Sequence, residues 1–206
     1  MDAETWDARY AAKATLEWGA EPNRWVAAEL AGLPPGRACD LGAGEGRNAI
    51  WLAGRGWRVT TVDFSARALA KGREVAEHGS VDLADRITWV CADVRAYTPD
   101  PAAYDLVLLS YLQLPEPERR AVVRTAAAAL APGGTLLVIG HDTTNIADGV
   151  GGPQHPDVLF TPPDVVADLA DLPGLTVERA DRVRRDVDTP AGQRQAIDAL
   201  VRVRRQ

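Results

Sequence analysis

The chain has 206 residues, of which 46% are apolar and 25% charged; this composition is ordinary for a globular protein and argues against extensive disorder. The 29 acidic residues outnumber the 23 basic ones, and the formal net charge of −6 disfavours a nucleic-acid partner because it provides no attraction to phosphate backbones. The length predicts one domain. Residues 1–10 lack a secretory pattern and no apolar run is long enough to span a membrane, so we expect a cytoplasmic protein without a membrane partner.

An N-terminal extension over residues 1–36 precedes the first predicted strand. It contains a helix predicted at Pro22–Ala31 and several large aromatic side chains. These side chains either anchor the extension to a sheet edge or wall a pocket for an apolar ligand, and the two interpretations are compatible. The aromatic residues are Trp6, Tyr10, Trp18 and Trp25.

From Arg37 to His141, short apolar runs alternate with helical patterns, which is typical of parallel strands joined by crossover helices. The runs are almost continuously apolar, so we expect strands buried on both faces. The predicted strands are Ala38–Leu41, Arg58–Val62, Ile87–Ala92, Leu106–Ser110 and Thr135–Gly140. The predicted helices are Arg47–Arg55, Ala66–His78 and Glu116–Leu130, with helix-end signals at Ser65, Pro117 and Pro132–Gly134.

A loop rich in glycine and proline, residues 141–163, separates this core from the C-terminal part. A helix predicted at Asp164–Asp171 precedes two strands, Leu175–Arg184 and Gln195–Arg204. The turn at Thr189–Gly192 between them predicts an antiparallel hairpin at a sheet edge. We therefore expect an α/β fold with a Rossmann-like, doubly wound, mostly parallel seven-stranded sheet that ends in this hairpin.

Cysteine and histidine usage favours neither a disulfide framework nor a metal centre. Cys39 and Cys91 are the only cysteines, and both fall in apolar, strand-like runs. His78, His141 and His155 lack the cysteine or carboxylate spacing of a metal site, so we expect no metal.

A glycine-rich turn follows the first predicted strand. Gly42, Gly44 and Gly46 allow positive φ and a close approach of a ligand to the backbone. The spacing is Gly-x-Gly-x-Gly, with Arg47 where a dinucleotide fingerprint has its third glycine, which weakens an interpretation as an NAD site. Asp40, just before the turn, would repel a pyrophosphate but suits the cationic end of a ligand.

Acidic residues also follow the next two predicted strands. Asp63 lies 21 positions after Gly42, the distance at which an acidic residue meets ribose hydroxyls in such folds. Asp93 follows the third strand, where a carboxylate could accept a hydrogen bond from an adenine amine. Because ligands bind outside the carboxyl ends of the strands in doubly wound sheets, these side chains are expected to converge on one crevice.

In this order the motifs resemble those of the class I S-adenosylmethionine-dependent methyltransferases. The match covers roughly Arg37–His141 and includes the glycine turn, the two acids, the strand at Asp105 and the Leu130–Leu136 turn. The resemblance implies S-adenosylmethionine as cofactor, with its ribose at Asp63 and its adenine at Asp93. The cofactor-binding residues that it implies are Asp40, Gly42, Ala43, Gly44, Gly46, Asn48, Asp63, Phe64, Asp93, Val94 and Ser110.

Two segments further resemble a small bacterial branch of this family, which includes TehB-like tellurite-resistance enzymes and heterocycle- or thiopurine-methylating enzymes. The segments are Trp18–Asn23 and Gly46–Ala49. In that branch the N-terminal segment closes over the cofactor. The resemblance therefore implies that Trp18 and Asn23 lie near its methionine end.

Methyl transfer from a sulfonium is an in-line displacement, so the enzyme must chiefly align the reactants and exclude water; positioning of this kind supplies roughly 7 to 11 kcal/mol. A base is needed for a hydroxyl or a protonated amine. His141 is the candidate base, with a structural role as the alternative, and Tyr111 is the candidate wall of the acceptor site. The loop after His141 is long enough for a lid; its polar residues include Thr143, Thr144, Asn145, Gln154 and His155.

The resulting prediction is a single methyltransferase domain over residues 1–206, with a small-molecule acceptor and no nucleic-acid partner, as a monomer or homodimer. Its parts are an N-terminal helical cap (1–36), a cofactor-binding core (37–141), and an acceptor loop with the hairpin (142–206). Two alternatives stay open: an NAD-dependent oxidoreductase and a non-catalytic cofactor-binding sensor or partner subunit.

Overall fold

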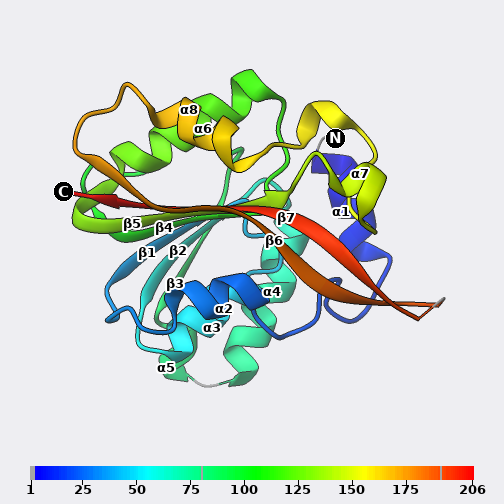
Figure 1. Ribbon diagram of the computed structural model, residues 1–206. Coiled ribbons are helices and arrows are strands. Elements are labelled where there is room, and N and C mark those ends of the chain that lie inside the picture. The colour runs from blue at the N-terminus through cyan, green and yellow to red at the C-terminus, as the bar shows by residue number, and fades with distance from the viewer. Residues whose placement is uncertain (1–2, 80, 191) are drawn as a thin grey trace.

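The computed structural model describes residues 3–79, 81–190 and 192–206, which form a twisted sheet between two layers of helices (Figure 1). Within these residues the sheet has seven strands in the order β3-β2-β1-β4-β5-β7-β6. Strands β1 to β5 are parallel, and β7 is antiparallel to β5 and β6. The strands are β1 (Arg37–Leu41), β2 (Arg58–Asp63), β3 (Ile87–Cys91), β4 (Tyr104–Ser110), β5 (Leu130–His141), β6 (Leu175–Thr189) and β7 (Gly192–Arg205). The predicted fold is confirmed, including the antiparallel hairpin.

Helices cover both faces of the sheet, and each face has its own apolar core. Successive side chains of a strand point to opposite faces. Leu106 and Leu108 of β4 therefore pack in the core under α2, α3 and α4, and Val107 and Leu109 pack in the core under α6 and α8. The helices are α1 (Ala3–Ala11), α2 (Arg24–Leu30), α3 (Arg47–Gly54), α4 (Ala66–Gly79), α5 (Val81–Ala84), α6 (Glu116–Ala128), α7 (Asn145–Asp148), the 3₁₀ helix η1 (Pro156–Val158) and α8 (Pro162–Leu169).

Capping side chains set where several helices begin. The Ser65 hydroxyl accepts from the backbone amide of Ala68 at 3.0 Å, as predicted for the start of α4. Thr161 and Asp164 form a reciprocal capping box at the start of α8. Each cap satisfies backbone amides that the first helical turn leaves without a partner.

Several predicted bounds differ from the structure by a few residues, and two features differ in kind. Strand β3 is an edge strand, so of its residues only Ile87 is buried and Cys91 is exposed, contrary to the prediction of strands buried on both faces. Helix α6 ends at Ala128 rather than Leu130, because Leu130 already belongs to β5. Pro132–Gly134 therefore lie within β5, at the point where the register between β4 and β5 shifts, and do not end the helix. The predicted hairpin turn includes Ala191, which lies outside the described residues.

The carboxyl ends of β1, β2, β4 and β5 lie at one edge of the sheet, and α1 and α7 lie at this end of the molecule (Figure 1). Doubly wound sheets bind their ligands at this edge. None of the described helices is both long enough and apolar enough to cross a membrane. The described residues also hold no cluster of three or more histidine, cysteine or acidic side chains placed to bind a metal ion.

Candidate cofactor and acceptor site

The glycine turn lies at the carboxyl end of β1 and requires glycine for two reasons. Gly42 and Gly44 have φ of 74° and 57°, a region that other residues rarely adopt. A Cβ on Gly42 would lie 2.9 Å from Leu112 Cδ1, and a Cβ on Gly44 would lie 2.7 Å from the Tyr10 hydroxyl. The turn is therefore enclosed by the loop after β4 and by the N-terminal extension.

Asp40 is the carboxylate that precedes this turn, and it is only 1% exposed. Neither of its oxygens has a hydrogen-bond partner among the described residues. Burial, with a further contribution from Asp63, raises the pKa of Asp40 to about 7, while Arg47 acts in the opposite direction. A buried carboxylate without a partner is costly, and a cationic ligand would satisfy it, so the site fits the positively charged end of S-adenosylmethionine.

Asp63, at the end of β2, supports the glycine turn. The backbone amide of Gly44 donates to its Oδ2 at 2.8 Å, and that of Ser65 donates to Oδ1 at 2.9 Å. Burial raises the pKa of Asp63, and these two hydrogen bonds oppose the rise. A carboxylate offers about four acceptor positions, so the oxygens retain capacity for ribose hydroxyls.

Asp93, predicted to meet the adenine amine, is already engaged by a neighbour. Arg95 donates to its Oδ2 through Nη2 at 2.6 Å and to Oδ1 through Nε at 3.0 Å. These hydrogen bonds lower the pKa of Asp93. An adenine amine would therefore share Asp93 with Arg95. Val94 is buried in the core, and Phe64 and Ser110 are partly buried.

The N-terminal extension is fastened to the glycine turn through two buried charges. Lys71 of α4 pairs with Glu45 at 2.6 Å. The same ammonium group donates to the carbonyls of Tyr10 at 3.1 Å and Thr15 at 2.7 Å. Glu45 also accepts from the backbone amide of Glu17 at 2.7 Å. We call this arrangement the Lys71–Glu45 latch.

Trp18, Asn23 and Asn48 link the extension to α3. The Asn23 side chain caps α2, and its backbone amide donates to Asn48 Oδ1 at 2.9 Å. The Trp18 carbonyl accepts from Arg47 at 3.1 Å, whereas its ring is 46% exposed. Asn23 and Asn48 are thus placed next to the glycine turn by contacts with each other.

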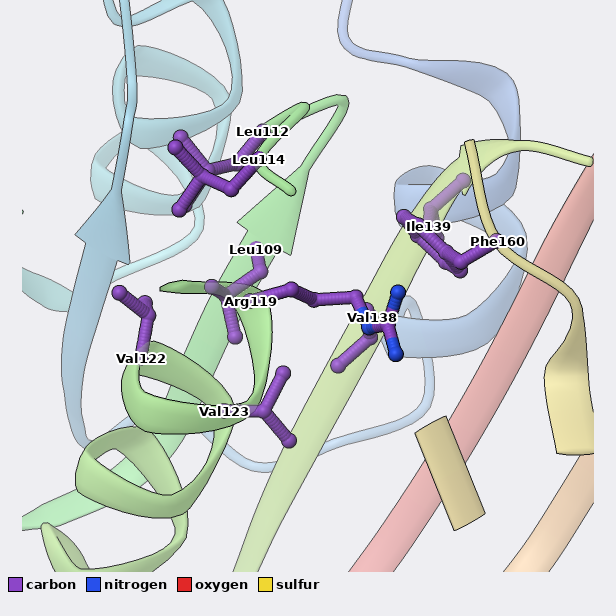
Figure 2. A pocket seen from close by; sticks show the side chains of 9 residues that line it. All are labelled: Leu109, Leu112, Leu114, Arg119, Val122, Val123, Val138, Ile139 and Phe160. Atoms are coloured by element: carbon purple, nitrogen blue, oxygen red, sulfur yellow. The ribbon is translucent and has the colours of Figure 1, made fainter. Parts of the chain in front are cut away.

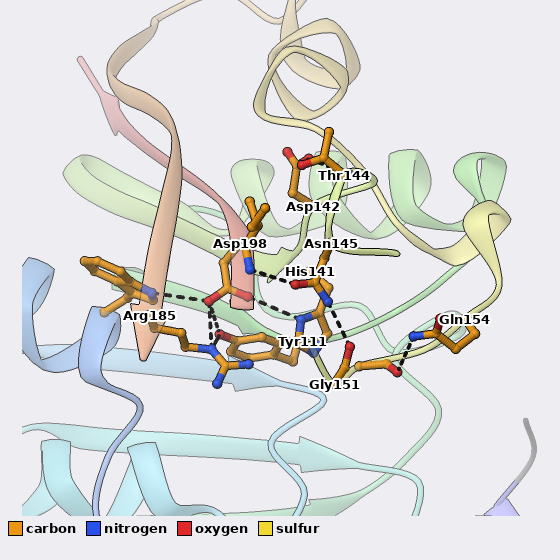
Figure 3. A network of polar contacts seen from close by, with 12 residues as sticks. Tyr111, His141, Asp142, Thr144, Asn145, Gly151, Gln154, Arg185 and Asp198 are labelled. Carbon is orange, nitrogen blue, oxygen red and sulfur yellow. Dashed lines mark hydrogen bonds and ion pairs between the residues drawn. The ribbon is translucent and has the colours of Figure 1, made fainter. Parts of the chain in front are cut away.

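Tyr111 follows β4 and has φ of 57°, an unfavourable region for a residue with a Cβ. Such strained positions are common at functional sites. Its hydroxyl donates to Asp198 Oδ2 at 2.7 Å and accepts from Arg185 Nε at 3.1 Å (Figure 3). Burial, followed by the charge of Asp198, raises the pKa of the Tyr111 phenol, so it is a poor base.

His141 ends β5 beside Tyr111, with the two ring centroids 4.8 Å apart. Its Nδ1 lies 3.3 Å from Asp198 Oδ1, an ion-pair distance that falls short of hydrogen-bond geometry. The ring is covered by Gly152, where a Cβ would come within 2.8 Å of His141 Nε2. The structure thus brings together both predicted acceptor-site residues.

The loop after His141 is anchored at several points rather than free. Asp142 Oδ1 accepts from the Thr144 hydroxyl at 2.7 Å and pairs with Arg182 at 2.9 Å. The Asn145 side chain accepts from the backbone amide of Ile197 at 2.7 Å and donates to the Gly151 carbonyl at 2.8 Å. Its role as a lid stays a prediction.

Sequence reasoning missed three residues of this site: Arg47, Arg185 and Asp198. Asp198 offered a signal, because it is a single carboxylate within the apolar run Ala196–Val201. The contacts of Arg47 depend on how the N-terminal cap packs, and those of Arg185 depend on the register of the hairpin. Neither can be predicted from the neighbouring residues in the sequence. Burial lowers the pKa of the Arg47 guanidinium, which lies within electrostatic range of Tyr111, Arg185 and Asp40.

A separate small cavity of about 10 Å³ lies on the α6 face of the sheet (Figure 2). Its lining is apolar except for Arg119, whose Nε pairs with Asp168 at 2.9 Å. This volume holds one water at most. The cavity is a packing gap and no place for a nucleoside. It is lined by Leu109, Leu112, Leu114, Arg119, Val122, Val123, Val138, Ile139 and Phe160.

Comparison with known sequences finds a family match for the central part of the chain. The family model for a methyltransferase domain matches residues 38–134. The tRNA 5-carboxymethoxyuridine methyltransferase of Escherichia coli is 34% identical over 104 residues, which cover 50% of this chain and 39% of that protein. The ubiquinone biosynthesis O-methyltransferase of Xanthomonas campestris is 32% identical over 114 residues, covering 55% of this chain and 46% of that protein. The chain thus spans less than half the length of either relative.

Solved structures share the fold over most of the chain. A structure described as the conversion of a disulfide bond into a thioacetal group during echinomycin biosynthesis has a TM-score of 0.74, at 23% identity, and covers 99% of this chain and 92% of that one. TehB from Haemophilus influenzae has a TM-score of 0.71, at 16% identity, covering 99% and 67%. The glycopeptide N-methyltransferase MtfA in complex with S-adenosylmethionine has a TM-score of 0.65, at 22% identity, covering 89% and 93%.

Residues 38–134 therefore match the family model of a methyltransferase domain, and most of the chain has the fold of a solved methyltransferase structure. This match agrees with the predicted methyltransferase family.

Proposed function

We propose that the protein transfers a methyl group from S-adenosylmethionine to a small-molecule acceptor by in-line displacement. The observation that carries this proposal is the buried carboxylate of Asp40 beside the glycine turn, which has no hydrogen-bond partner in the described part of the chain. A cationic donor satisfies this charge, whereas the diphosphate of NAD is repelled by it. When bound, S-adenosylmethionine supplies the methyl group.

The cofactor-binding roles in this proposal follow the order of the strands. Asp40 and the glycine turn hold the methionine part, and Asp63 accepts from the ribose hydroxyls with the acceptor capacity that Gly44 and Ser65 leave free. Asp93 meets the adenine amine while it keeps its pair with Arg95. The Lys71–Glu45 latch holds the N-terminal cap against the turn and excludes water.

At the acceptor end, Tyr111 forms the wall and His141 is the base. Tyr111 follows β4 and His141 ends β5, and these two strands are neighbours in the sheet. The loop that begins at Tyr111 also reaches the glycine turn, because Leu112 lies against Gly42. The proposal divides the single domain into the cap (1–36), the cofactor-binding core (37–141) and the acceptor loop with its hairpin (142–206).

A small acceptor is favoured over a nucleic acid by charge. The net charge of −6 gives no general attraction to phosphates. Relatives and structural neighbours carry names that refer to varied acceptors, including ubiquinone biosynthesis, a glycopeptide and tRNA. The acceptor of this protein is therefore assigned from its own site.

The test is a turnover assay with the full chain. The protein is incubated with S-adenosylmethionine and a panel of small hydroxyl, amine and thiol compounds, and S-adenosylhomocysteine and the methylated product are quantified by mass spectrometry. We expect stoichiometric formation of both with at least one compound. Binding of the cofactor without product from any compound would favour a non-catalytic sensor.

A further inference from the structure

Asp198 is a buried carboxylate on β7, the strand between β5 and the edge strand β6, and the site as described so far leaves its role open. It lies on β7 directly opposite His141 of β5 in the antiparallel register, and its exposure is 0%. An isolated charge at such a position is costly. The groups that contact the Asp198 carboxylate therefore indicate the role of its charge.

The two oxygens of Asp198 have different partners (Figure 3). Oδ2 lies within hydrogen-bond distance of three donors: the Tyr111 hydroxyl at 2.7 Å, Arg185 Nε at 2.9 Å and Trp25 Nε1 at 3.3 Å. Among the residues that the structure describes, Oδ1 has no hydrogen bond and faces His141 Nδ1 at 3.3 Å, and that nitrogen has no other partner there. The three donors hold the carboxylate in place, and its free oxygen is left for the imidazole.

This arrangement favours one tautomer of His141. A carboxylate that faces Nδ1 stabilises the form with the proton on Nδ1, because the alternative form would set two acceptors against each other. The other ring nitrogen, Nε2, then carries a lone pair. An outer partner of this kind fixes both ring orientation and tautomer.

We propose that Asp198 is the positioning residue that makes His141 a base through Nε2, and that the acceptor is a hydroxyl compound. This inference rests on the proposed methyl transfer and names its substrate class. Asp198 itself contacts neither the acceptor nor the donor and acts through His141.

The charges around Tyr111 favour a hydroxyl over an amine. Arg185 donates to the Tyr111 hydroxyl, and Arg47 lies within electrostatic range of both groups. A protonated amine would approach two guanidinium groups and the sulfonium of the donor, which repel it. A hydroxyl gains negative charge as its proton leaves, and the same cations stabilise that charge.

The proposed step balances without any further reactant. The acceptor O–H bond breaks and its proton moves to His141 Nε2. The oxygen electron pair forms the bond to the methyl carbon, and the electron pair of the carbon–sulfur bond stays on sulfur, giving a methyl ether and S-adenosylhomocysteine. His141 then releases the proton to solvent. Because the Gly152 backbone covers the ring, an acceptor reaches Nε2 once this loop has moved.

The decisive measurement is the nitrogen-15 NMR spectrum of histidine-labelled protein loaded with S-adenosylhomocysteine. His141→Gln assigns the signals, because the chain has three histidines. We expect neutral His141 to carry its proton on Nδ1, and Asp198→Asn to abolish this preference while product affinity changes less than about twofold. A wild-type proton on Nε2, or the same tautomer in Asp198→Asn, would overturn the positioning role. The wild-type spectrum alone tests the predicted tautomer of His141, even if the Asp198→Asn variant fails to fold.

Kinetics provide the second readout. We expect Asp198→Asn to lower kcat by about 10²-fold or more, the usual contribution of a general base, with little change in KM for S-adenosylmethionine. Asp186→Asn removes the same charge from an exposed position of the hairpin and should leave kcat unchanged. Equal kcat for Asp198→Asn and wild type would contradict the proposal.

The substrate class is tested with phenol and catechol against benzylamine and thiophenol. We expect methylation of a hydroxyl probe, with benzylamine and thiophenol slower. Preference for the amine or thiol would refute the hydroxyl class and leave the proposed methyl transfer standing. No product from any probe while S-adenosylhomocysteine binds would count against methyl transfer as well. Absence of cofactor binding would instead defeat the proposed function itself.

Discussion

Asp40 is enclosed at the carboxyl end of β1, where no donor among the described residues reaches its two oxygens. Burial raises the pKa of this carboxyl to about 7. A buried carboxylate with a pKa shifted in this way is a candidate ligand-binding group. A bound cation and the buried carboxylate would stabilise each other. Without a ligand, the unpaired buried charge lowers the free energy of unfolding.

The substitution Asp40→Asn separates the effect of this carboxylate on ligand affinity from its effect on the stability of the unliganded protein. We expect the affinity for S-adenosylmethionine to fall roughly 10- to 100-fold, because a hydrogen bond to a charged group contributes about 1.5–3 kcal/mol. The thermal midpoint of the unliganded variant at pH 8 should rise, since the unpaired buried charge is gone. Calorimetry and thermal unfolding measure the two quantities, with the exposed Asp188→Asn as control. Unchanged affinity in a folded Asp40→Asn variant would contradict this role.

The pKa of Asp40 also predicts a pH dependence. Its folded-state pKa of about 7 lies above the value of about 3.9 for an unfolded chain. The folded protein therefore retains a proton that the unfolded chain has lost, so Asp40 reduces the free energy of unfolding as pH rises from about 4 to about 7.

Cofactor binding should reverse this protonation. A cationic ligand favours the ionised carboxylate, so binding at pH 6 should release a proton and binding at pH 9 should release none. Calorimetry in two buffers of different ionisation enthalpy counts the protons. Asp40→Asn should show no such release at pH 6, and an equal release in both proteins would assign the proton to another group.

At the scale of elements, the N-terminal cap and the C-terminal hairpin complete a site whose core lies in the parallel strands. The Lys71–Glu45 latch joins the cap to α4 and the glycine turn. The β6–β7 hairpin places Arg185 and Asp198 beside Tyr111 at the proposed acceptor end. Both elements lie outside residues 38–134, the part that matches the family model, and this is consistent with a shared cofactor and a varied acceptor.

The latch gives a stability prediction. Lys71→Met leaves Glu45 buried without its counter-charge, and we expect the free energy of unfolding to fall by about 3–5 kcal/mol. Lys13→Met removes the exposed end of a second pair, Lys13–Glu17, and should cost less than about 1 kcal/mol. Urea unfolding measures both. Similar losses in the two variants would show that the latch is no stronger than a surface pair.

The parallel strands and the glycine turn could be predicted from sequence, because their apolar runs and spacings are local signals. The site needed more than local information. Asp198 meets His141 only through the β5–β7 register, and Tyr10 meets Gly44 only after the cap packs on the turn. Asp93 shows the opposite case, since its position was predicted but its pairing with Arg95 was not.

For the molecule as a whole, the acidic surface predicts weak interaction with nucleic acid. With a net charge of −6, the protein should not bind unfractionated tRNA at physiological salt, because phosphate contacts by basic residues supply most non-specific affinity. An electrophoretic mobility assay at several salt concentrations tests this. Salt-sensitive tRNA binding in the micromolar range would point instead to a nucleic-acid acceptor.

The central claim is that the enclosed carboxylate and the glycine turn receive a sulfonium nucleoside rather than a dinucleotide. Isothermal titration of the full chain with S-adenosylmethionine, S-adenosylhomocysteine and NAD⁺ tests it most directly. We expect saturable binding of the first two ligands and none of NAD⁺. Binding of NAD⁺, or no heat with either sulfur nucleoside in folded protein, would contradict the account.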